Sequence, residues 1–217
     1  MKLDIPLIIQ KKNSEECGLA CLAMVLKFYN ASKSLSKLRK QIHVYPWIWI
    51  FMPQLWSYLL EQWFEVEIIS MNPHIVTYQD SKKSQSELLQ YFSALSKKTS
   101  NVRHKTCLQY FVKFMELWGI FTPRIPSPKD IKKWIDQHSP LLTIMTSNFL
   151  WSSLPSFNFH FHVITWIDKS YVYVNDPMYG GFGGQKKIPI DTYMYSIYAS
   201  AHGDLDNAAL LLIRKSI

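Results

Sequence analysis

Cysteine is scarce in this chain, with only three residues in 217. An odd number of cysteines in a chain of this length does not make a disulfide framework, which excludes the small secreted domains that disulfides hold together. The apolar run within residues 1–10 is too short and too interrupted for a signal peptide. We therefore expect a reducing compartment, either the cytoplasm of the cell that makes the protein or the cytosol of another cell into which it is delivered.

Acidic residues are also few, 16 against 24 basic ones, which gives a formal net charge of +8. That surplus allows attraction to acidic proteins, anionic lipid or nucleic acid, but it selects none of them. The sequence contains no glycine-rich phosphate loop, no paired carboxylates suited to two metal ions and no basic residues alternating with aromatics. We therefore expect no cofactor, no metal and no specific nucleic acid partner. Nothing in the sequence sets the oligomeric state.

Long uninterrupted apolar runs are absent as well. Val44–Leu60 has no charged residue, but its 17 residues are at the lower limit for a membrane span and are broken by Pro46 and Pro53. We expect no transmembrane segment here, and predict an extended stretch followed by a helix. Trp47 and Trp49 stand at alternate positions, where they pack in the core, line a substrate cleft or make a peripheral membrane contact.

Cys17 stands at the predicted start of an amphipathic helix, in the run Glu-Glu-Cys-Gly-Leu-Ala-Cys-Leu-Ala-Met. A helix N-terminus carries about half a positive charge and several unpaired N–H groups, which stabilise a thiolate and hold an oxyanion. Gly18 leaves room for a substrate backbone beside the sulfur, and the amide of Gln10 is placed to complete an oxyanion hole with the Cys17 N–H. Cys17 is therefore the candidate nucleophile, whereas Cys21 and Cys107 are expected to be buried packing residues.

A thiol nucleophile needs a base, and usually a third group that orients the base. Residues 159–178 read as two alternating strands joined by a short loop, the pattern of a β-hairpin. A three-residue loop places His162 opposite Asp176 and makes His160 the diagonal neighbour of Asp176. Strand geometry alone therefore accepts either histidine as the base.

These segments together resemble the papain-like superfamily in its compact bacterial form, the C39-like peptidases. The shared pattern is a glutamine, a short spacer and Cys-Gly-x-Ala, followed late in the chain by His-aromatic-hydrophobic-Val and Asn-Asp-Pro. Most of the chain also resembles the guanylyl-cyclase-domain-containing proteins, whose sequences are papain-like rather than cyclase-like. That likeness rests on Cys-Gly-Leu-Ala-Cys, on Ser-Tyr-Leu-Leu at 57–60 and on Ser-Ala-His-Gly-Asp-Leu-Asp at 200–206. Both resemblances imply a papain-like fold, and the first implies a protein or peptide substrate.

An ungapped match to the peptidase pattern places His160 at its histidine and Asp176 in its Asn-Asp-Pro. The catalytic residues that this match implies are Cys17, His160, Asp176 and Gln10. His162 takes a place that the family usually fills with an aliphatic residue, and it is the alternative base. The spacer between Gln10 and Cys17 is one residue longer than the commonest form, so Asn13 is the alternative source of the oxyanion-stabilising amide.

The expected fold is α+β and papain-like (C39-like), one domain over residues 1–217 in which the N-terminal helix that carries Cys17 packs on an antiparallel β-sheet. Residues 70–126 are polar between short apolar helices, and a papain-like core does not need them. We predict that they form a helical insertion capping one side of the cleft. The other elements predicted are helices at 53–63, 128–137 and 190–200 and strands at 64–69, 141–145 and 208–213.

The sequence thus predicts a papain-like cysteine hydrolase that cleaves peptide or amide bonds through an acyl-enzyme. Two alternatives use the same residues, namely acyl transfer to an amine and deamidation of a glutamine side chain. A third, of a different class, is a non-catalytic interaction module that binds partners through its basic and aromatic surface. The double glycines within residues 180–184 are also compatible with self-cleavage.

Overall fold

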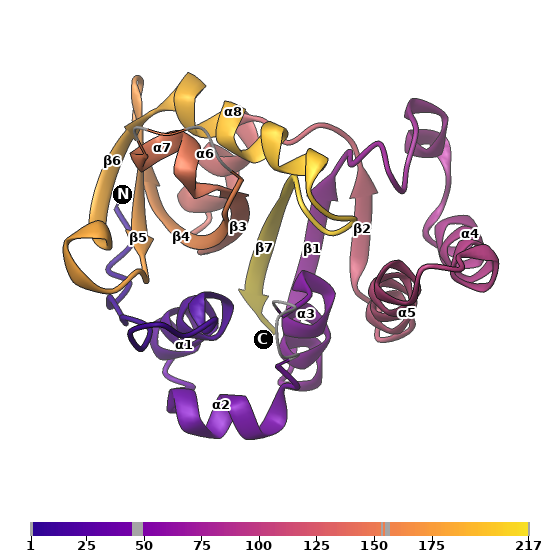
Figure 1. Ribbon diagram of the computed structural model, residues 1–217, viewed down its shortest axis with the longest axis horizontal. Helices are drawn as coiled ribbons and strands as arrows, with labels where there is room; N and C mark the ends of the chain where they lie inside the picture. Colours follow the sequence, from indigo (N-terminus) through magenta and orange to yellow (C-terminus); the bar gives the residue numbers. More distant parts are fainter. Residues whose placement is uncertain (1, 45–49, 153, 155–156, 217) are drawn as a thin grey trace.

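A seven-stranded sheet forms the centre of the protein, in a computed structural model that describes residues 2–44, 50–152, 154 and 157–216. The strands lie in the order β2-β1-β7-β3-β4-β5-β6 (Figure 1). Neighbouring strands are antiparallel, apart from the parallel pair β1 and β2. The structure confirms the α+β fold with an N-terminal helix on a largely antiparallel sheet.

The strands are β1 (Phe64–Ser70), β2 (Ile120–Pro123), β3 (Leu141–Thr146), β4 (Phe159–Ile167), β5 (Tyr171–Asp176), β6 (Gly184–Pro189) and β7 (Ala209–Lys215). The helices are α1 (Cys17–Phe28), α2 (Leu35–Gln41), α3 (Met52–Glu61), α4 (Gln85–Lys98), α5 (Val102–Glu116), α6 (Pro128–Asp136), α7 (Ser147–Trp151) and α8 (Ile190–Ala199). The sequence predicts most of these elements to within a few residues. It does not predict α2, α7, β2 or β6.

Helices cover the sheet on more than one side, so its central strands are apolar runs rather than alternating ones. Every residue of β3 is buried. In Figure 1, α1, α2 and α3 gather at one end of the view, and α6, α7 and α8 gather at the other. α1 packs on β4 and α3 packs on β1. This packing brings the first residue of α1, Cys17, to the strand that carries both histidines.

The segment 70–126 is not only helical, as the sequence predicts, because its last part forms the edge strand β2. Aromatic packing joins the segment to the main core. The rings of Phe92 and Phe111 stack with centroids 5.2 Å apart, and Phe121 meets both rings edge-on. Trp56 of α3 contacts Phe111 in turn. Figure 1 shows α4 and α5 beside β2, at the edge of the sheet opposite β6.

The β4–β5 hairpin contains a bulge that the sequence does not reveal. Ile167 pairs with Val172, one residue beyond the partner that a three-residue loop would give it. The register then shifts around Thr165, so that Val163 lies opposite Asn175. The extra residue of the bulge therefore restores the predicted register at the end of the hairpin that carries the histidines.

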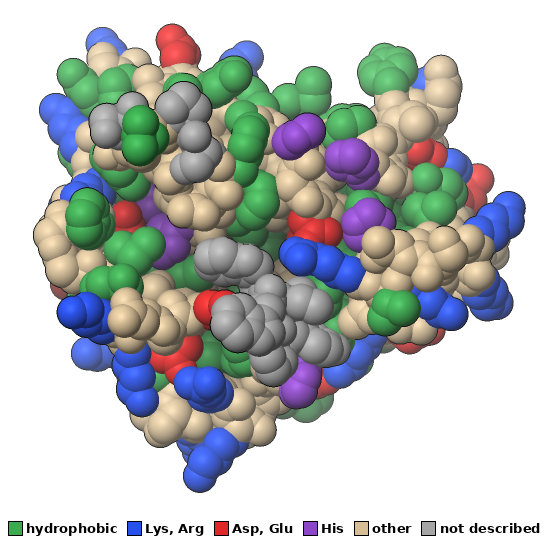
Figure 2. Space-filling view, viewed as in Figure 1, with side chains coloured by type: hydrophobic (Ala, Val, Ile, Leu, Met, Phe, Trp, Pro, Cys, Tyr) green, Lys and Arg blue, Asp and Glu red, His purple; other side chains and the backbone are tan. Residues whose placement is uncertain are grey.

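Lys and Arg side chains are scattered over one face, most of them near its margin, rather than gathered in a single patch (Figure 2). Within the described ranges, no helix is long and apolar enough to cross a membrane. The uncharged stretch predicted to end in a helix does so at α3, which begins at Met52 and buries Trp56 completely. Trp47 and Trp49, predicted to lie in the core, a cleft or a membrane contact, fall outside the described residues.

Asn175 ties the N-terminal segment to the sheet, since its Nδ2 donates to the buried carbonyl of Ile5 at 2.8 Å. Replacing it with alanine leaves that carbonyl without its donor, at a cost of about 1–3 kcal/mol. Asn175→Ala should lower the free energy of unfolding in urea by that amount, whereas Ser170→Ala in the exposed hairpin loop should leave it unchanged. If the two variants had the same midpoint of urea unfolding, contacts other than this hydrogen bond would hold the N-terminal segment.

Candidate active site

Cys17 is the first residue of α1 and is 2% exposed. The hydrogen bond from the Ala20 N–H to the Glu16 carbonyl, at 2.8 Å, is the first of the helix, and the Glu16 side chain does not cap it. The Cys17 N–H therefore lies before the helical ladder, at the positive end of the helix. This end of α1 can polarise a thiol and hold an oxygen that becomes negative.

Gly18, expected from the sequence to leave room for a substrate backbone, also has a packing role. A Cβ at this position would lie 3.1 Å from Cδ1 of Leu55 and 3.3 Å from a ring carbon of Phe161. The residue is buried where α1 meets α3 and β4. The glycine thus lets α1 approach β4 closely, and this approach sets how near Cys17 comes to the histidines.

Glu16, the residue before Cys17, has a buried carboxylate. Its Oε1 accepts a hydrogen bond from Arg39 of α2 at 2.8 Å. The same contact is an ion pair between the guanidinium and the carboxylate. A lone negative charge here would oppose a thiolate at the next residue, so the Arg39 guanidinium is needed to offset it. The sequence shows an acidic residue next to Cys17, but it does not predict that Arg39, 23 positions away, is the partner of that residue.

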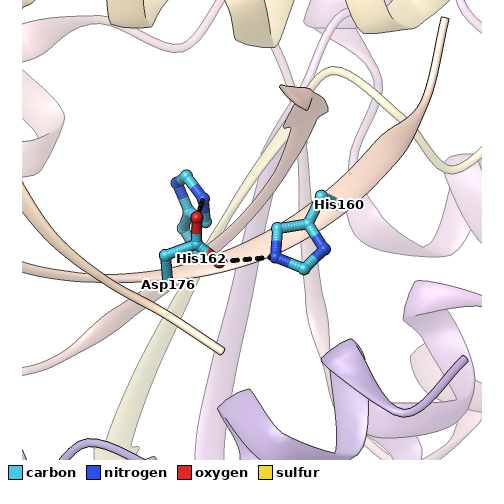
Figure 3. Close-up of side chains that lie close together, drawn as sticks. All are labelled: His160, His162 and Asp176. Atoms are coloured by element: carbon cyan, nitrogen blue, oxygen red, sulfur yellow. Dashed lines mark hydrogen bonds and ion pairs between the residues drawn. The ribbon is translucent and has the colours of Figure 1, made fainter. Parts of the chain in front are cut away.

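His160 and Asp176 form a buried hydrogen-bonded pair, with 2.7 Å between Nε2 and Oδ1. His160 lies near the start of β4, and Asp176 is the last residue of β5. Figure 3 shows the carboxylate between the imidazoles of His160 and His162. Cys17 is near enough to the His160 imidazole to favour its charged form. Because Asp176 occupies Nε2, the nitrogen that remains for Cys17 is Nδ1.

These contacts determine the charge of His160. Burial disfavours the imidazolium, but the hydrogen bond that it donates to Asp176 and its interaction with Cys17 outweigh burial and raise the pKa of His160 to about 9. The pKa of Asp176 moves the other way. Burial would raise it, but the two histidines hold it well below its ordinary value. The pair is therefore an imidazolium and a carboxylate at neutral pH.

The backbone that follows β5 holds the Asp176 carboxylate in place. The N–H of Met178 donates to Oδ1 at 2.8 Å, the same oxygen that His160 uses. Asn175 points elsewhere, toward Ile5, as expected for adjacent residues of a strand. Asp176, and not Asn175, therefore lies on the side of the sheet that carries the histidines.

His162 lies on the other side of Asp176, with 3.3 Å between its Nε2 and Oδ2. It is fully buried, and its ring lies parallel to that of Tyr193 in α8, with centroids 6.1 Å apart. Among the described residues, neither of its ring nitrogens has a well-formed hydrogen bond. Burial lowers the pKa of His162 and outweighs the attraction of Asp176, so this imidazole is neutral.

His160, His162 and Asp176 are also the one group in the described part of the chain whose ligand atoms are grouped closely enough to suggest a metal site. The 2.7 Å hydrogen bond between His160 and Asp176 argues against that use, because zinc ligands each lie about 2.0–2.2 Å from a shared ion and must separate from one another to admit it. We therefore describe these residues as a hydrogen-bonded group.

Gln10 is buried beside the end of β5, since its N–H donates to the carbonyl of Pro177 at 2.8 Å. Its side-chain Nε2 donates to the carbonyl of Ser14 at 2.9 Å, which leaves a second N–H on that nitrogen. A tight turn, with Asn13 at φ 56°, takes up the extra residue of the spacer. Asn13, the alternative amide, is exposed, and its Oδ1 accepts a hydrogen bond from Tyr179.

A cavity of about 460 Å³ opens beside these residues. His160, Asp176 and Gln10 line it, and Cys17 is not among the described residues that do. Its walls come from the turn before α1, from α7 and the start of β4, and from the glycine-rich loop after β5. The remaining lining residues are Asn13, Ser14, Ser147, Asn148, Trp151, Ser152, Asn158, Phe159, Met178, Tyr179 and Phe182.

The other two cysteines are buried in the core. Burial raises the pKa of Cys21 well above its ordinary value, and nearby negative charge from Cys17 and Asp176 adds to the effect. Burial likewise raises the pKa of Cys107. Both are therefore neutral thiols, as the sequence leads us to expect.

Solved structures of similar fold are peptidases or peptidase domains. One is a double glycine motif protease from an AMS/PCAT transporter, in complex with a leader peptide, with a TM-score of 0.51 and 17% identity over 99% of this chain and 94% of that one. Another is the peptidase domain of Streptococcus ComA, a bifunctional ABC transporter, with a TM-score of 0.50 and 11% identity over 97% and 98% of the two chains. A third is a putative C39-like peptidase from Bacillus anthracis, with a TM-score of 0.50 and 15% identity over the whole of both chains. At such identities the likeness concerns the fold alone.

No curated protein matches the chain. The family model for the Peptidase C39 like family matches residues 2–203, a range that includes the cysteine, both histidines and the aspartate described above. A match over nearly the whole length, together with the fold, assigns the chain to that family. The protein belongs to the Peptidase C39 like family.

Proposed function

We propose that the protein is a cysteine peptidase whose catalytic residues are Cys17, His160 and Asp176. One observation carries the proposal: a buried carboxylate holds an imidazole at 2.7 Å, and that imidazole interacts with a thiol at a helix N-terminus. Acyl transfer to a thiol needs a nucleophile next to a base, and a third group that orients the base.

In the first step, Cys17 Sγ attacks the carbonyl carbon of the scissile bond as a thiolate, with the His160 imidazolium beside it. A carbon–sulfur bond forms, and the carbonyl oxygen takes the negative charge. The Cys17 N–H and the free N–H of the Gln10 amide stabilise that oxygen. The carbon–nitrogen bond then breaks, and the leaving nitrogen takes the proton from Nδ1 of His160.

In the second step, water attacks the acyl-enzyme while Nδ1 of His160, now neutral, accepts a proton from it. The carbon–sulfur bond breaks, the acid product leaves and Cys17 returns to the thiolate. Asp176 stabilises the imidazolium in both steps and fixes the ring so that Nδ1 faces the thiol. The Arg39 partner of Glu16 keeps the charge near the sulfur favourable.

His162 has a different part in this proposal from the base that strand geometry alone allows. It is fully buried, neutral and packed on Tyr193. A group so enclosed does not reach a substrate, but an Nε2–H beside Oδ2 of Asp176 can hold the carboxylate in position. We assign His162 as a positioning residue.

A peptide is the proposed substrate. One of the structural neighbours is a protease in complex with a leader peptide, which supports a peptide as the bound chain. The cavity beside His160 is also of the size that proteins use to bind small ligands and short segments.

The nucleophile is tested by three cysteine variants. A peptide library would be incubated with each variant, and new termini read by mass spectrometry. Cys17→Ala should abolish cleavage and keep a native circular dichroism spectrum, whereas Cys21→Ala and Cys107→Ala should keep most of the activity despite a loss of stability, since they remove buried volume. Full cleavage by Cys17→Ala would refute the proposal, and no cleavage by any form would favour a non-catalytic binding module.

The base is tested by comparing the two histidines. His160→Ala should lower kcat by about a hundredfold or more, the range for a general acid–base group. His162→Gln should lower it much less, because that residue does not touch the substrate. Thermal melting would check that both variants fold. Reversed losses would make His162 the base.

The role of Asp176 gives a pH dependence with a definite sign. Because the pKa of His160 in the folded protein, about 9, lies above the unfolded value of about 6.5, the imidazolium stabilises the fold fully below pH 6.5 and loses that effect as the pH rises through 9. In Asp176→Asn the pKa of His160 should fall. The difference in free energy of unfolding between this variant and wild type should therefore shrink as the pH rises from 6.5 to 9. NMR titration of the imidazole and urea unfolding measure the two effects.

In Asn175→Ala, the control, His160 should still titrate at about 9. A shift in this control with none in Asp176→Asn would reverse the assignment.

A further inference from the structure

The cavity of about 460 Å³ borders the imidazole of His160. His160 delivers its proton to the leaving nitrogen, so that nitrogen must be on the imidazole side of the reacting carbon. The described lining of the cavity includes His160 and Gln10 but not Cys17. The part of the substrate after the scissile bond therefore enters the cavity, while the acyl part stays on the sulfur.

The cavity lining is uncharged apart from the catalytic pair. Among the described lining residues, only His160 and Asp176 are charged, and each is already bonded to the other. This stands out in a protein with a formal net charge of +8. The walls offer apolar and aromatic side chains instead, chiefly Trp151, Phe159, Met178 and Phe182.

Hydrogen bonds hold the cavity walls in place without a ligand. The Tyr179 hydroxyl bonds Oδ1 of Asn13 at 3.0 Å and so joins the glycine-rich loop to the turn before α1. Ser147 bonds the carbonyl of Asn158 through both its N–H and its hydroxyl, at 2.8 and 3.0 Å. In the glycine-rich loop, a Cβ on Gly183 would lie 1.7 Å from the carbonyl oxygen of Met178, so only glycine fits at this position of the backbone.

The geometry points to a substrate whose residue directly after the scissile bond has a large uncharged side chain, aromatic or methionine-like, held by Trp151 and Phe182. This inference rests on the proposed function. A Lys or Glu side chain in the same place would lose hydration, and the two charges of the lining, on His160 and Asp176, already pair with each other. The Lys186 ammonium is outside the lining, 5.2 Å from the centroid of the Trp151 ring. Pockets of this kind discriminate by about 10–200-fold in kcat/KM, and we expect at least tenfold here.

The first test uses a peptide from the library that wild type cleaves, with the residue after the cut changed to Phe, Met, Ala, Lys or Glu. The Phe and Met peptides should exceed the Lys and Glu peptides by at least tenfold in kcat/KM. Equal values across the series, or a preference for Lys or Glu, would overturn the inference and leave the peptidase assignment intact.

Variants of the exposed wall residues sharpen this test. Trp151 and Phe182 are 39% and 70% exposed, so truncating them leaves the core untouched. In Trp151→Ala and Phe182→Ala the ratio of kcat/KM for Phe over Ala peptides should fall severalfold, and Phe182→Glu should raise kcat/KM for the Lys peptide. Trp118→Ala, the control, removes an aromatic side chain that is 90% exposed and outside the cavity lining, and it should change neither. An unchanged ratio in both wall variants contradicts the inference.

A binding measurement makes the test independent of turnover. The Cys17→Ala protein would be titrated with the tripeptides Phe-Ser-Gly, Lys-Ser-Gly and Glu-Ser-Gly, which represent leaving fragments, and followed by NMR. Phe-Ser-Gly should bind at least tenfold more tightly and shift the indole signal of Trp151. Such binding without any peptide cleavage by wild type would support the cavity and refute the proposed function. Absence of binding by Phe-Ser-Gly at millimolar concentration, or equal binding of all three, would overturn the inference.

Discussion

The hydrogen bond between His160 and Asp176 is the interaction on which the rest of the site depends. It joins two strands at the end of a hairpin, turns Nδ1 of the imidazole toward Cys17 and keeps that imidazole charged although it is buried. Much of the surrounding fold serves this contact. The bulge in β4 sets the register that brings the two residues together, and the Met178 N–H holds the carboxylate. The glycine at the start of α1 lets the helix approach β4 closely enough for the thiol to meet the imidazole.

A buried carboxylate lies between two imidazoles in this site. The two histidines share one strand and one carboxylate, yet their surroundings separate their properties. His160 interacts with the thiol of Cys17 and lies on a cavity wall, and its pKa is raised to about 9. His162 has the Tyr193 ring and the core around it, and its pKa is lowered. One residue is thus suited to moving protons and the other to holding the carboxylate, although strand geometry alone makes them look equivalent.

The sequence predicts those parts of the fold and site that depend on local patterns. The start of α1 at Cys17 and the two strands of the β4–β5 hairpin are local, and the structure has both. What it does not reveal depends on distant partners. β2 is four residues long and exists because β1 offers it an edge. The bulge is set by the turn and by pairing across the hairpin, the Arg39 partner of Glu16 comes from another helix, and Gly18 makes its contacts with α3 and β4.

The most direct test of the central claim is to trap the acyl-enzyme on Cys17. The protein would be mixed with an activated ester of a peptide that it cleaves, quenched in acid and digested, and the cysteine-containing fragments weighed by mass spectrometry. The account predicts one acyl group on the fragment containing Cys17, abundant in wild type and strongly reduced in His160→Ala. Hydrolysis of the ester with no acyl group on Cys17, or with the acyl group on Cys21 or Cys107, would contradict it.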